Sequence, residues 1–382
     1  MQGFVHPDFA EVAARFGRQI ARQAVGGGAV CVYHRGECVV DVWGGDRNAA
    51  GEPWEHDTMA LSWSTTKGVA SMALHMLADR QMVDYDAPVA RYWSEFAQNG
   101  KESITVRQVM CHEAGLHRLA EMIDSADDLL DWERVARGIE AARPAYEPGT
   151  RSGYHALTYG NIVGEIVRRV SGKPVYEFAQ VELADPLGLD GLNLWVPPDQ
   201  RHRVAQLTKM AAFLDGTRPM PASLSRASSH LREISQVGVA GMGSLFWSPR
   251  VFDAVIPSAN GMFTARSLAR MYAAVAEGGS LDGVRIVSPE TVDVMGRVQS
   301  RRIDAVVAFP MHWRMGFHLV GTPRGILPYA FGHWGYGGSG GWADPSRRLA
   351  VALVVNRVAG TPFGDQRLVQ LSGSAVAAAE RR

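Results

Sequence analysis

Apolar and polar positions along the chain indicate several helices and strands. Near the start, apolar side chains recur at the 3.6-residue period of an amphipathic helix, behind a Pro and an Asp suited to a helix start. This pattern predicts a helix over about residues 7–24. The segment 27–45, GAVCVYHRGECVVDVWGG, holds two β-branched-rich runs that meet at Arg35-Gly36, which predicts a hairpin. The apolar residues that mark the first helix are Phe9, Val12, Ala13, Phe16 and Ile20.

The rest of the chain divides into a helical middle and a strand-rich end. A run from Ser64 to about Arg80 is apolar on nearly all sides, and such a helix is buried. Helical patterns broken by Pro and Gly fill about 84–250. Strand-like segments follow, and a last helix is expected over about 365–380. These strands are expected at 313–321, 336–344 and 349–357, the last two joined by the turn 344–347.

Strands at both ends of the chain predict one antiparallel sheet built from both termini. We therefore expect an α/β (α+β) fold in which terminal helices flank the sheet and a helical domain is inserted. The expected division is a sheet domain of residues 1–80 and 251–382 and a mainly helical domain of residues 81–250. A site would lie in the crevice between the two.

Composition excludes several classes of function. The 39 Lys and Arg residues balance the 39 Asp and Glu residues, so no bulk positive field exists to bind nucleic acid or anionic membranes. No basic n-region leads into an apolar segment at the N-terminus, and no apolar run reaches the roughly 20 residues of a membrane span. We expect a cytoplasmic protein with reduced thiols. Cys31 and Cys38 are expected to lie close together on the hairpin without a bridge.

The sharpest local pattern is Ser64-Thr65-Thr66-Lys67 at the mouth of the buried helix. Side chains three residues apart share a helix face, so the Lys67 amine is expected within reach of the Ser64 hydroxyl. Serine needs such a base because its hydroxyl is a poor nucleophile near neutral pH. Lysine can serve where burial lowers its pKa. Without this chemistry, the same residues would be a helix cap and a solvated lysine.

Two further segments could carry chemistry. Tyr154 follows Pro148-Gly149-Thr150 in the turn before a predicted helix of residues 157–170, where its hydroxyl could point into a crevice. A core or surface tyrosine is the plain alternative. The glycine-dense segment 332–338, GHWGYGG, is expected to open a strand and would let a ligand approach the backbone closely. Its plain alternative is a strained turn or a bulge.

These three elements, in this order, resemble the serine β-lactamase and penicillin-binding-protein superfamily, with its class C β-lactamase fold, and within it the family VIII carboxylesterases. Ser64 to Lys67 matches S-x-x-K, and residues 148–154 match P-G-T-x-x-x-Y. Residues 107–116 look like the family's helix ending in H-x-x-G-L. His333-Trp334-Gly335 falls where lactamases have K-T-G and these esterases have H-x-G or W-G-G.

The resemblance implies roles for individual residues. Ser64 would be the acylated nucleophile, Lys67 its base and Tyr154 a proton relay. The amides of Ser64 and Tyr336 would form the oxyanion hole, and a helix N-terminus suits such a donor. The residues matching the third motif, His333, Trp334 and Gly335, would bind substrate.

Several other patterns compete with this assignment. Ser339 lies in a literal G-x-S-x-G, but that motif needs a strand-turn-helix and here a strand is expected to follow. Tyr159 is in a literal Y-x-N but falls inside the predicted helix. His112 and His117 are five residues apart and do not share a helix face, so no metal or other cofactor is expected. The stretch 242–247 is interpreted as core, with an apolar acyl pocket as the alternative.

Departures from the lactamase pattern favour esters over β-lactams. Where lactamases have the Asn of the Tyr motif this chain has Ala156, and where they have the Lys of K-T-G it has His333, mostly neutral at pH 7. We therefore expect a serine hydrolase of short-chain carboxylic esters, with weak β-lactam hydrolysis as a possible side activity.

Two rival functions stay open. One is a β-lactamase or D-amino-acid peptidase, and the other is a catalytically silent binding protein. The expected partner is a small-molecule ester, with no nucleic acid and no membrane. Oligomeric state, the physiological ester and the activator of the deacylating water, Tyr154 or His333, are not indicated.

Overall fold

A computed structural model describes residues 1–23, 25–209, 239–358 and 365–382. Its central feature is a seven-stranded antiparallel sheet in the order β1-β3-β2-β13-β12-β11-β10. Both ends of the chain contribute strands, so the expected α/β architecture with a two-ended sheet is confirmed. The strands, in sheet order, are β1 (Gln2–Val5), β3 (Glu37–Gly45), β2 (Gly27–His34), β13 (Leu349–Val355), β12 (Gly340–Asp344), β11 (Gly325–Trp334) and β10 (His318–Thr322).

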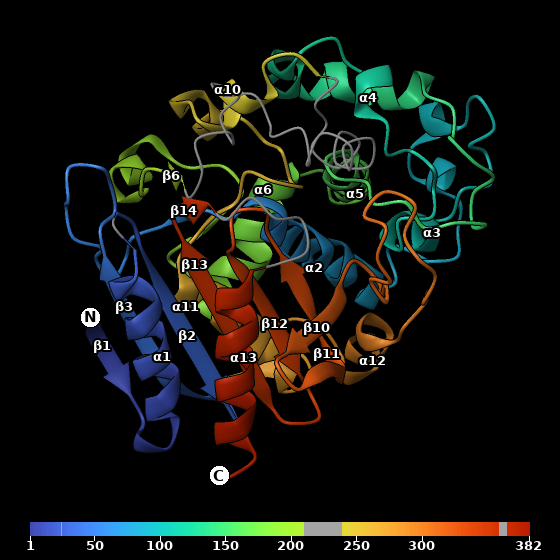
Figure 1. Ribbon diagram of the computed structural model, residues 1–382. Helices are drawn as coiled ribbons and strands as arrows, with labels where there is room; N and C mark the ends of the chain where they lie inside the picture. Colours follow the sequence, from blue (N-terminus) through green and yellow to red (C-terminus); the bar gives the residue numbers. More distant parts are fainter. Residues whose placement is uncertain (24, 210–238, 359–364) are drawn as a thin grey trace.

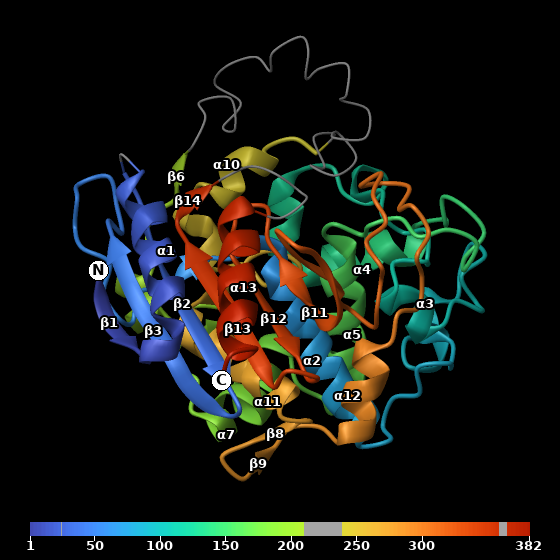
Figure 2. The same ribbon diagram turned by 60° about the horizontal axis from the view of Figure 1, so that its bottom comes forward.

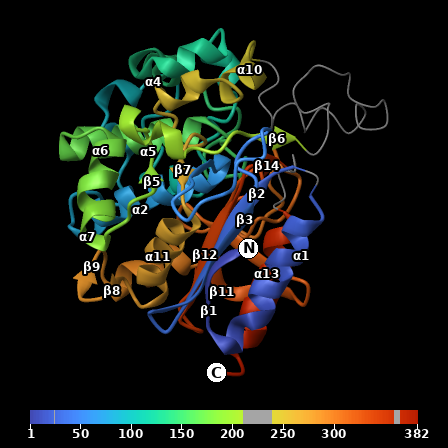
Figure 3. The ribbon, with the colours of Figure 1, turned by 90° about the vertical axis from the view of Figure 1, so that its left-hand side faces the viewer.

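Helices cover both faces of this sheet. Figures 1 and 2 show α1 (Ala10–Ala21) and α13 (Gln366–Ala379) together on one face. The side view in Figure 3 places α11 (Ala265–Ala276) and α2 (Thr66–Asp79) on the other. The predicted terminal helices and the buried helix after Ser64 are therefore confirmed.

Two-sided burial explains the apolar runs of the central strands. Along β13 the residues Leu349, Val351 and Leu353 pack in the core beneath α1 and α13, whereas Ala350 and Ala352 face the core beneath α11 and α2. Alternate residues of a strand point to opposite faces, so a strand covered on both sides reads as a continuous apolar run.

The remaining helices gather on the side of α2 away from the sheet, as Figures 1 and 3 show. Part of the predicted helical region, residues 210–238, lies outside the described residues. The domain boundaries proposed from the sequence stay a prediction. These helices are α3 (Val106–Met110), α4 (Trp132–Ala141), α5 (Thr158–Ser171), α6 (Val175–Ala179), α7 (Asp185–Leu187) and α10 (Met242–Phe246), and α12 (Pro289–Gly296) lies beside β11.

Short strand pairs complete the fold. One three-stranded ribbon leads directly into the Ser64 region. Within the described residues, no helix combines the length and apolarity needed to cross a bilayer. The ribbon is β4 (Ala60–Leu61), β7 (Met262–Phe263) and β5 (Leu192–Asn193), and the other pairs are β6 (Thr208–Lys209) with β14 (Arg357–Val358) and β8 (Ser280–Leu281) with β9 (Val284–Arg285).

Three details differ from the sequence predictions or extend them. The strand expected from residue 313 begins only at His318, because Gly316 adopts φ 79° and Arg314 closes a turn to Phe317. The glycine-dense segment lies at the end of β11 and in the following turn, not at the opening of a strand. Cys31 and Cys38 lie with their sulfur atoms 3.9 Å apart and unbridged, as expected.

Candidate active site

Ser64 lies in a single 3-10 turn, Trp63–Thr65, between strand β4 and helix α2. Trp63 adopts φ 49°, a left-handed conformation that is uncommon for a bulky residue, and local strain of this kind is frequent at functional sites. The Thr65 hydroxyl donates to the Ser339 carbonyl oxygen at 3.0 Å and ties the turn to the sheet. Ser64 itself is half-buried at the start of the helix.

Lys67 lies one turn into α2, fully buried, with its Nζ 3.3 Å from the Ser64 Oγ. Its amine also donates to the carbonyl oxygens of Ala156 at 2.7 Å and Ser258 at 3.0 Å. Burial alone holds the pKa of Lys67 well below its ordinary value, because no acidic side chain offsets the lost hydration. The Lys67 amine therefore lies within reach of the Ser64 hydroxyl in surroundings that favour its neutral form.

Tyr154 reaches Ser64 from the segment that precedes α5. Its hydroxyl hydrogen-bonds to Ser64, and the Lys67 Nζ lies 4.9 Å from its ring centroid. Burial raises the pKa of Tyr154, the bond to Ser64 opposes that rise, and the nearby Asp304 carboxylate adds to it. The structure therefore brings together the three residues singled out from the sequence: Ser64, Lys67 and Tyr154.

The turn between β11 and β12 forms the opposite wall. The Gly335 amide donates to the Ser339 carbonyl at 2.8 Å and the Gly338 amide to the Gly335 carbonyl at 3.0 Å. The Ser64 and Tyr336 amides donate to no other described residue. A Cβ at Gly335 would lie 2.2 Å from the Ser62 carbonyl oxygen, so glycine lets this turn approach the serine turn.

His333 lies at the end of β11, buried, with its Nδ1 3.0 Å from the Trp334 carbonyl oxygen. That contact requires a hydrogen on Nδ1, which leaves Nε2 as a lone-pair acceptor. Nε2 is buried and has no partner among the described residues. Burial holds the pKa of His333 well below its ordinary value, with His318 and Lys67 adding to the effect. His333 and Trp334 line a small hollow beside Tyr154.

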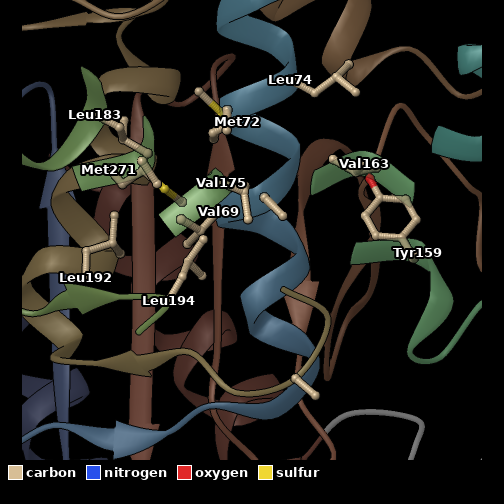
Figure 4. Packing of buried hydrophobic residues seen from close by; sticks show 14 of the residues in the cluster. Val69, Met72, Leu74, Tyr159, Val163, Val175, Leu183, Leu192, Leu194 and Met271 are labelled. Carbon is tan, nitrogen blue, oxygen red and sulfur yellow. The ribbon is translucent and has the colours of Figure 1, made fainter. Parts of the chain in front are cut away.

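Competing candidates from the sequence have other positions. Ser339 is fully buried and its Oγ accepts from the Val355 amide at 3.1 Å, and β12 follows it instead of a helix. Tyr159 lies in α5, and its hydroxyl is 2.7 Å from the Ser71 Oγ. Figure 4 shows Tyr159 among buried apolar side chains. His112 accepts from the His155 amide at 3.1 Å. Among the described residues, no cluster of His, Cys, Asp and Glu suits a metal.

Two residues that hold this site were not singled out from the sequence. Ser258 supplies one carbonyl to Lys67, and its Oγ bonds to the Leu157 carbonyl oxygen at 2.6 Å and the Gly160 amide at 2.7 Å. Asp304 accepts the Tyr154 amide at 3.1 Å. Only Asp304 carries a sequence signal, as a lone acid in front of the apolar run AVVAF.

An apolar cavity of about 330 Å³ lies beside the serine turn. Phe246 lines it and also packs against Trp63, with ring centroids 5.0 Å apart. Part of the stretch 242–247 therefore borders a cavity as well as the core. The other lining residues are Leu61, Val204, Ala205, Gln206, Leu207, Trp247, Ser248, Pro249, Val251, Phe252 and Met262.

Several known proteins are similar to this chain in both sequence and fold. The chain is 41% identical over 362 residues to the esterase/beta-lactamase LipL of Mycobacterium tuberculosis (strain ATCC 25618 / H37Rv), covering 93% of this chain and 83% of that protein. The crystal structure of a family VIII carboxylesterase superposes with a TM-score of 0.89 at 34% identity and 99% coverage of both chains.

A second solved structure supports the same relationship. A penicillin-binding protein homolog from Caulobacter crescentus superposes with a TM-score of 0.86 at 33% identity, again with 99% of both chains covered. The sequence model of the family described as Beta-lactamase matches residues 12–372, which include every residue of the site. This protein therefore belongs to the Beta-lactamase family.

Proposed function

We propose that this protein is a serine hydrolase of short-chain carboxylic esters that forms an acyl-enzyme on Ser64. The placement of Lys67 carries the proposal. A neutral amine has two hydrogens and one lone pair. The carbonyls of Ala156 and Ser258 accept two hydrogens, so the lone pair is left for the Ser64 hydroxyl 3.3 Å away.

The proposed acylation begins as Lys67 takes the Ser64 proton and Oγ attacks the ester carbonyl carbon. The resulting oxyanion accepts hydrogen bonds from the Ser64 and Tyr336 amides, and removing one such donor typically costs about 2.7 to 4 kcal/mol. Tyr154 gives its proton to the departing alkoxide and recovers one from Lys67. Water then attacks the acyl carbon, which releases the acid and returns the proton to Ser64.

The third motif favours esters over β-lactams. His333 presents a lone pair and no positive charge, so it cannot pair with the carboxylate that a penicillin carries. Ala156 contributes its backbone carbonyl to Lys67 and has no side-chain amide for a lactam substituent. The name of one structural relative, a family VIII carboxylesterase, also supports an ester substrate, whereas LipL is called an esterase/beta-lactamase and so does not separate the two substrate classes.

The cavity beside Trp63 is assigned to the acyl chain. Its lining is mainly apolar, and Phe246 connects it to the serine turn through the contact with Trp63. Pockets of a few hundred Å³ are of the size that binds small organic groups. An acyl chain extending past the Trp63 ring would exchange water for this apolar surface.

A serine-reactive phosphonate tests the proposal. Mass spectrometry is expected to find the adduct on Ser64. A label on Ser339 would contradict the mechanism and favour an α/β-hydrolase-like site. The absence of any label would also contradict it and would favour a catalytically silent protein. Ser64→Ala should abolish hydrolysis of nitrophenyl acetate, whereas Ser339→Ala, its matched control, should keep most of it. A cephalosporin turned over faster than a butyrate ester would favour the β-lactamase or peptidase alternative.

A further inference from the structure

Asp304 is a fully buried carboxylate that accepts from four N–H donors and has no cationic partner among the described residues. Its Oδ1 accepts the backbone amides of Tyr154 at 3.1 Å, Val306 at 2.8 Å and Val307 at 3.0 Å. Its Oδ2 accepts the indole N–H of Trp313 at 2.9 Å. A buried charge is costly unless it is paired or hydrogen-bonded. This anion is retained at the site by oriented N–H groups instead of a positive side chain.

These bonds hold Tyr154 in two ways. The bond from the Tyr154 amide to Oδ1 fixes the Tyr154 backbone directly. The bond from the Trp313 indole to Oδ2 fixes that indole, which stacks on the phenol ring with centroids 5.6 Å apart and planes 10° from parallel. The Ala305 amide, next to Asp304, donates to the Ser152 carbonyl at 2.8 Å and joins the same two segments. The position of the Tyr154 hydroxyl at Ser64 thus depends on Asp304.

The charge of Asp304 also acts on the phenol. The groups facing Tyr154 are Lys67 from α2, His112 from the loop after α3 and His333 from β11, with His318 of β10 behind His333. Burial holds the pKa of each of these three imidazoles below its ordinary value, to about 4 for His318, so they are neutral near pH 7. When Lys67 is also neutral, the negative charge near the phenol is that of Asp304.

We propose that Asp304 is a positioning residue: by holding the Tyr154 backbone and the Trp313 ring stacked on it, Asp304 aims the Tyr154 hydroxyl at Ser64. Burial is the main reason that Tyr154 keeps its proton, and the charge of Asp304 adds to it. This proposal rests on the proposed function. A purely structural carboxylate would close the 304–313 loop without affecting which proton moves. The hydrogen bonds and the charge of Asp304 can be tested separately. Oδ1 holds the backbone amides and Oδ2 holds the Trp313 indole, whereas the negative charge is shared by both oxygens.

A double variant isolates the charge. Asp304→Asn keeps one oxygen for the three backbone amides, but its amide N–H would face the Trp313 N–H. Trp313→Phe removes that clash and keeps a ring over Tyr154. The readout is the pH profile of kcat/KM for nitrophenyl acetate, followed at the isosbestic wavelength of nitrophenol. On the proposed mechanism, Lys67 should give its acid limb and Tyr154 its basic limb.

The basic limb should move to lower pH in the double variant, because removing the negative charge eases loss of the phenol proton. The acid limb should stay, because burial alone sets the pKa of Lys67. The single variant Trp313→Phe retains the charge and should keep both limbs. If the double variant fails to fold, the basic limb of Asp304→Asn is compared with that of Asp304→Ala, which removes the charge without placing an N–H against the Trp313 indole.

Asp304→Ala removes the hold on Tyr154 and should lower kcat by roughly 10-fold to 100-fold with little change in KM, since small misplacements cost this much. Asp304→Asn should recover part of that loss. Asp344→Asn is the matched control, a second fully buried carboxylate that accepts from Ser346 and Arg347 in the turn after β12. It should leave the basic limb in place.

An unmoved basic limb in the double variant, or an equal movement in Asp344→Asn, overturns the role of Asp304. The phosphonate separates this failure from a failure of the proposed function. Protein labelled at Ser64 with an unmoved basic limb contradicts the assignment of Asp304 alone, whereas unlabelled wild-type protein contradicts both proposals.

Discussion

Lys67 should be a free base in the folded protein, and the pH dependence of stability can show it. The unfolded chain holds this amine near its ordinary pKa of 10.5, whereas burial lowers the pKa in the folded state. Folding therefore releases a proton at any pH between these two values. The free energy of unfolding consequently rises with pH across that window, by about 1.4 kcal/mol per pH unit for a single group.

The substitution Lys67→Met removes this pH-dependent contribution to the free energy of unfolding and keeps a side chain of similar length. The wild-type free energy of unfolding, minus that of the variant, should increase by about 1.4 kcal/mol for each pH unit between the lowered pKa of the folded state and 10.5. The variant also leaves the carbonyls of Ala156 and Ser258 without a donor, which costs about 1 to 3 kcal/mol each, with no dependence on pH. The slope, and not the absolute difference, therefore reports the protonation of Lys67.

Urea unfolding followed by far-ultraviolet circular dichroism at several pH values measures this slope. A second assay uses the small number of lysines, because the chain has only four and selective ¹³C labelling gives four resolved side-chain titrations. Lys101 is the matched control, since its amine donates to three carbonyl oxygens and has no hydroxyl to deprotonate. Burial lowers the pKa of Lys101 to about 8.

A difference in unfolding free energy that stays flat from about pH 7.5 to 9.5 would refute the reasoning, because it would mean that the folded protein keeps Lys67 charged. The NMR assay should agree. The Lys67 resonance should titrate below that of Lys101, and a Lys67 resonance that keeps its ammonium shift above pH 9 would exclude this residue as the base.

Three further predictions follow from contacts at the site. Tyr154→Phe should lower kcat about 100-fold to 10,000-fold as a proton-transfer group is lost, whereas Tyr159→Phe should lose about 1 kcal/mol of unfolding free energy and stay active; equal kcat losses would contradict the assignment. Gly335→Ala places a Cβ 2.2 Å from the Ser62 carbonyl oxygen and should reduce kcat by about 100-fold or more through the displaced Tyr336 amide. Gly243→Ala, with open space around its Cβ, should match wild type in the same assay. Ala205→Phe fills the apolar cavity and should reduce kcat/KM for nitrophenyl octanoate more than for the acetate, and an unchanged ratio would show that acyl chains bind elsewhere.

Elements with a clear periodicity were predictable, and those without one were not. The hairpin of β2 and β3 and both terminal helices follow from regular apolar spacing and turn residues. Strand β1, QGFV, is exposed over three of its four residues and has no apolar face to read. Strand β11 was not predicted because a register shift in its pairing with β10 interrupts the alternation of buried and exposed residues.

The reacting residues were visible in the sequence because their motifs are local or match a family pattern. The groups that hold them were not. Ser258 supports Lys67 through a backbone carbonyl 191 positions away, and any residue type supplies that atom. Asp304 reaches the Tyr154 amide across 150 positions. Such bonds are made by tertiary packing, which leaves no spacing in the sequence to read.

The pairing of β2 with β13 has a consequence for how this protein is made on the ribosome. Register places His34 opposite Leu349, so an eight-residue strand that is buried in the finished sheet waits for about 315 further residues to be synthesised. At roughly 5 to 20 residues per second, that delay is about 15 to 60 s. Throughout it, one edge of the hairpin is an apolar template open to wrong partners. We expect nascent chains to need a chaperone in this interval, and esterase activity to emerge only after the last strands have joined the sheet.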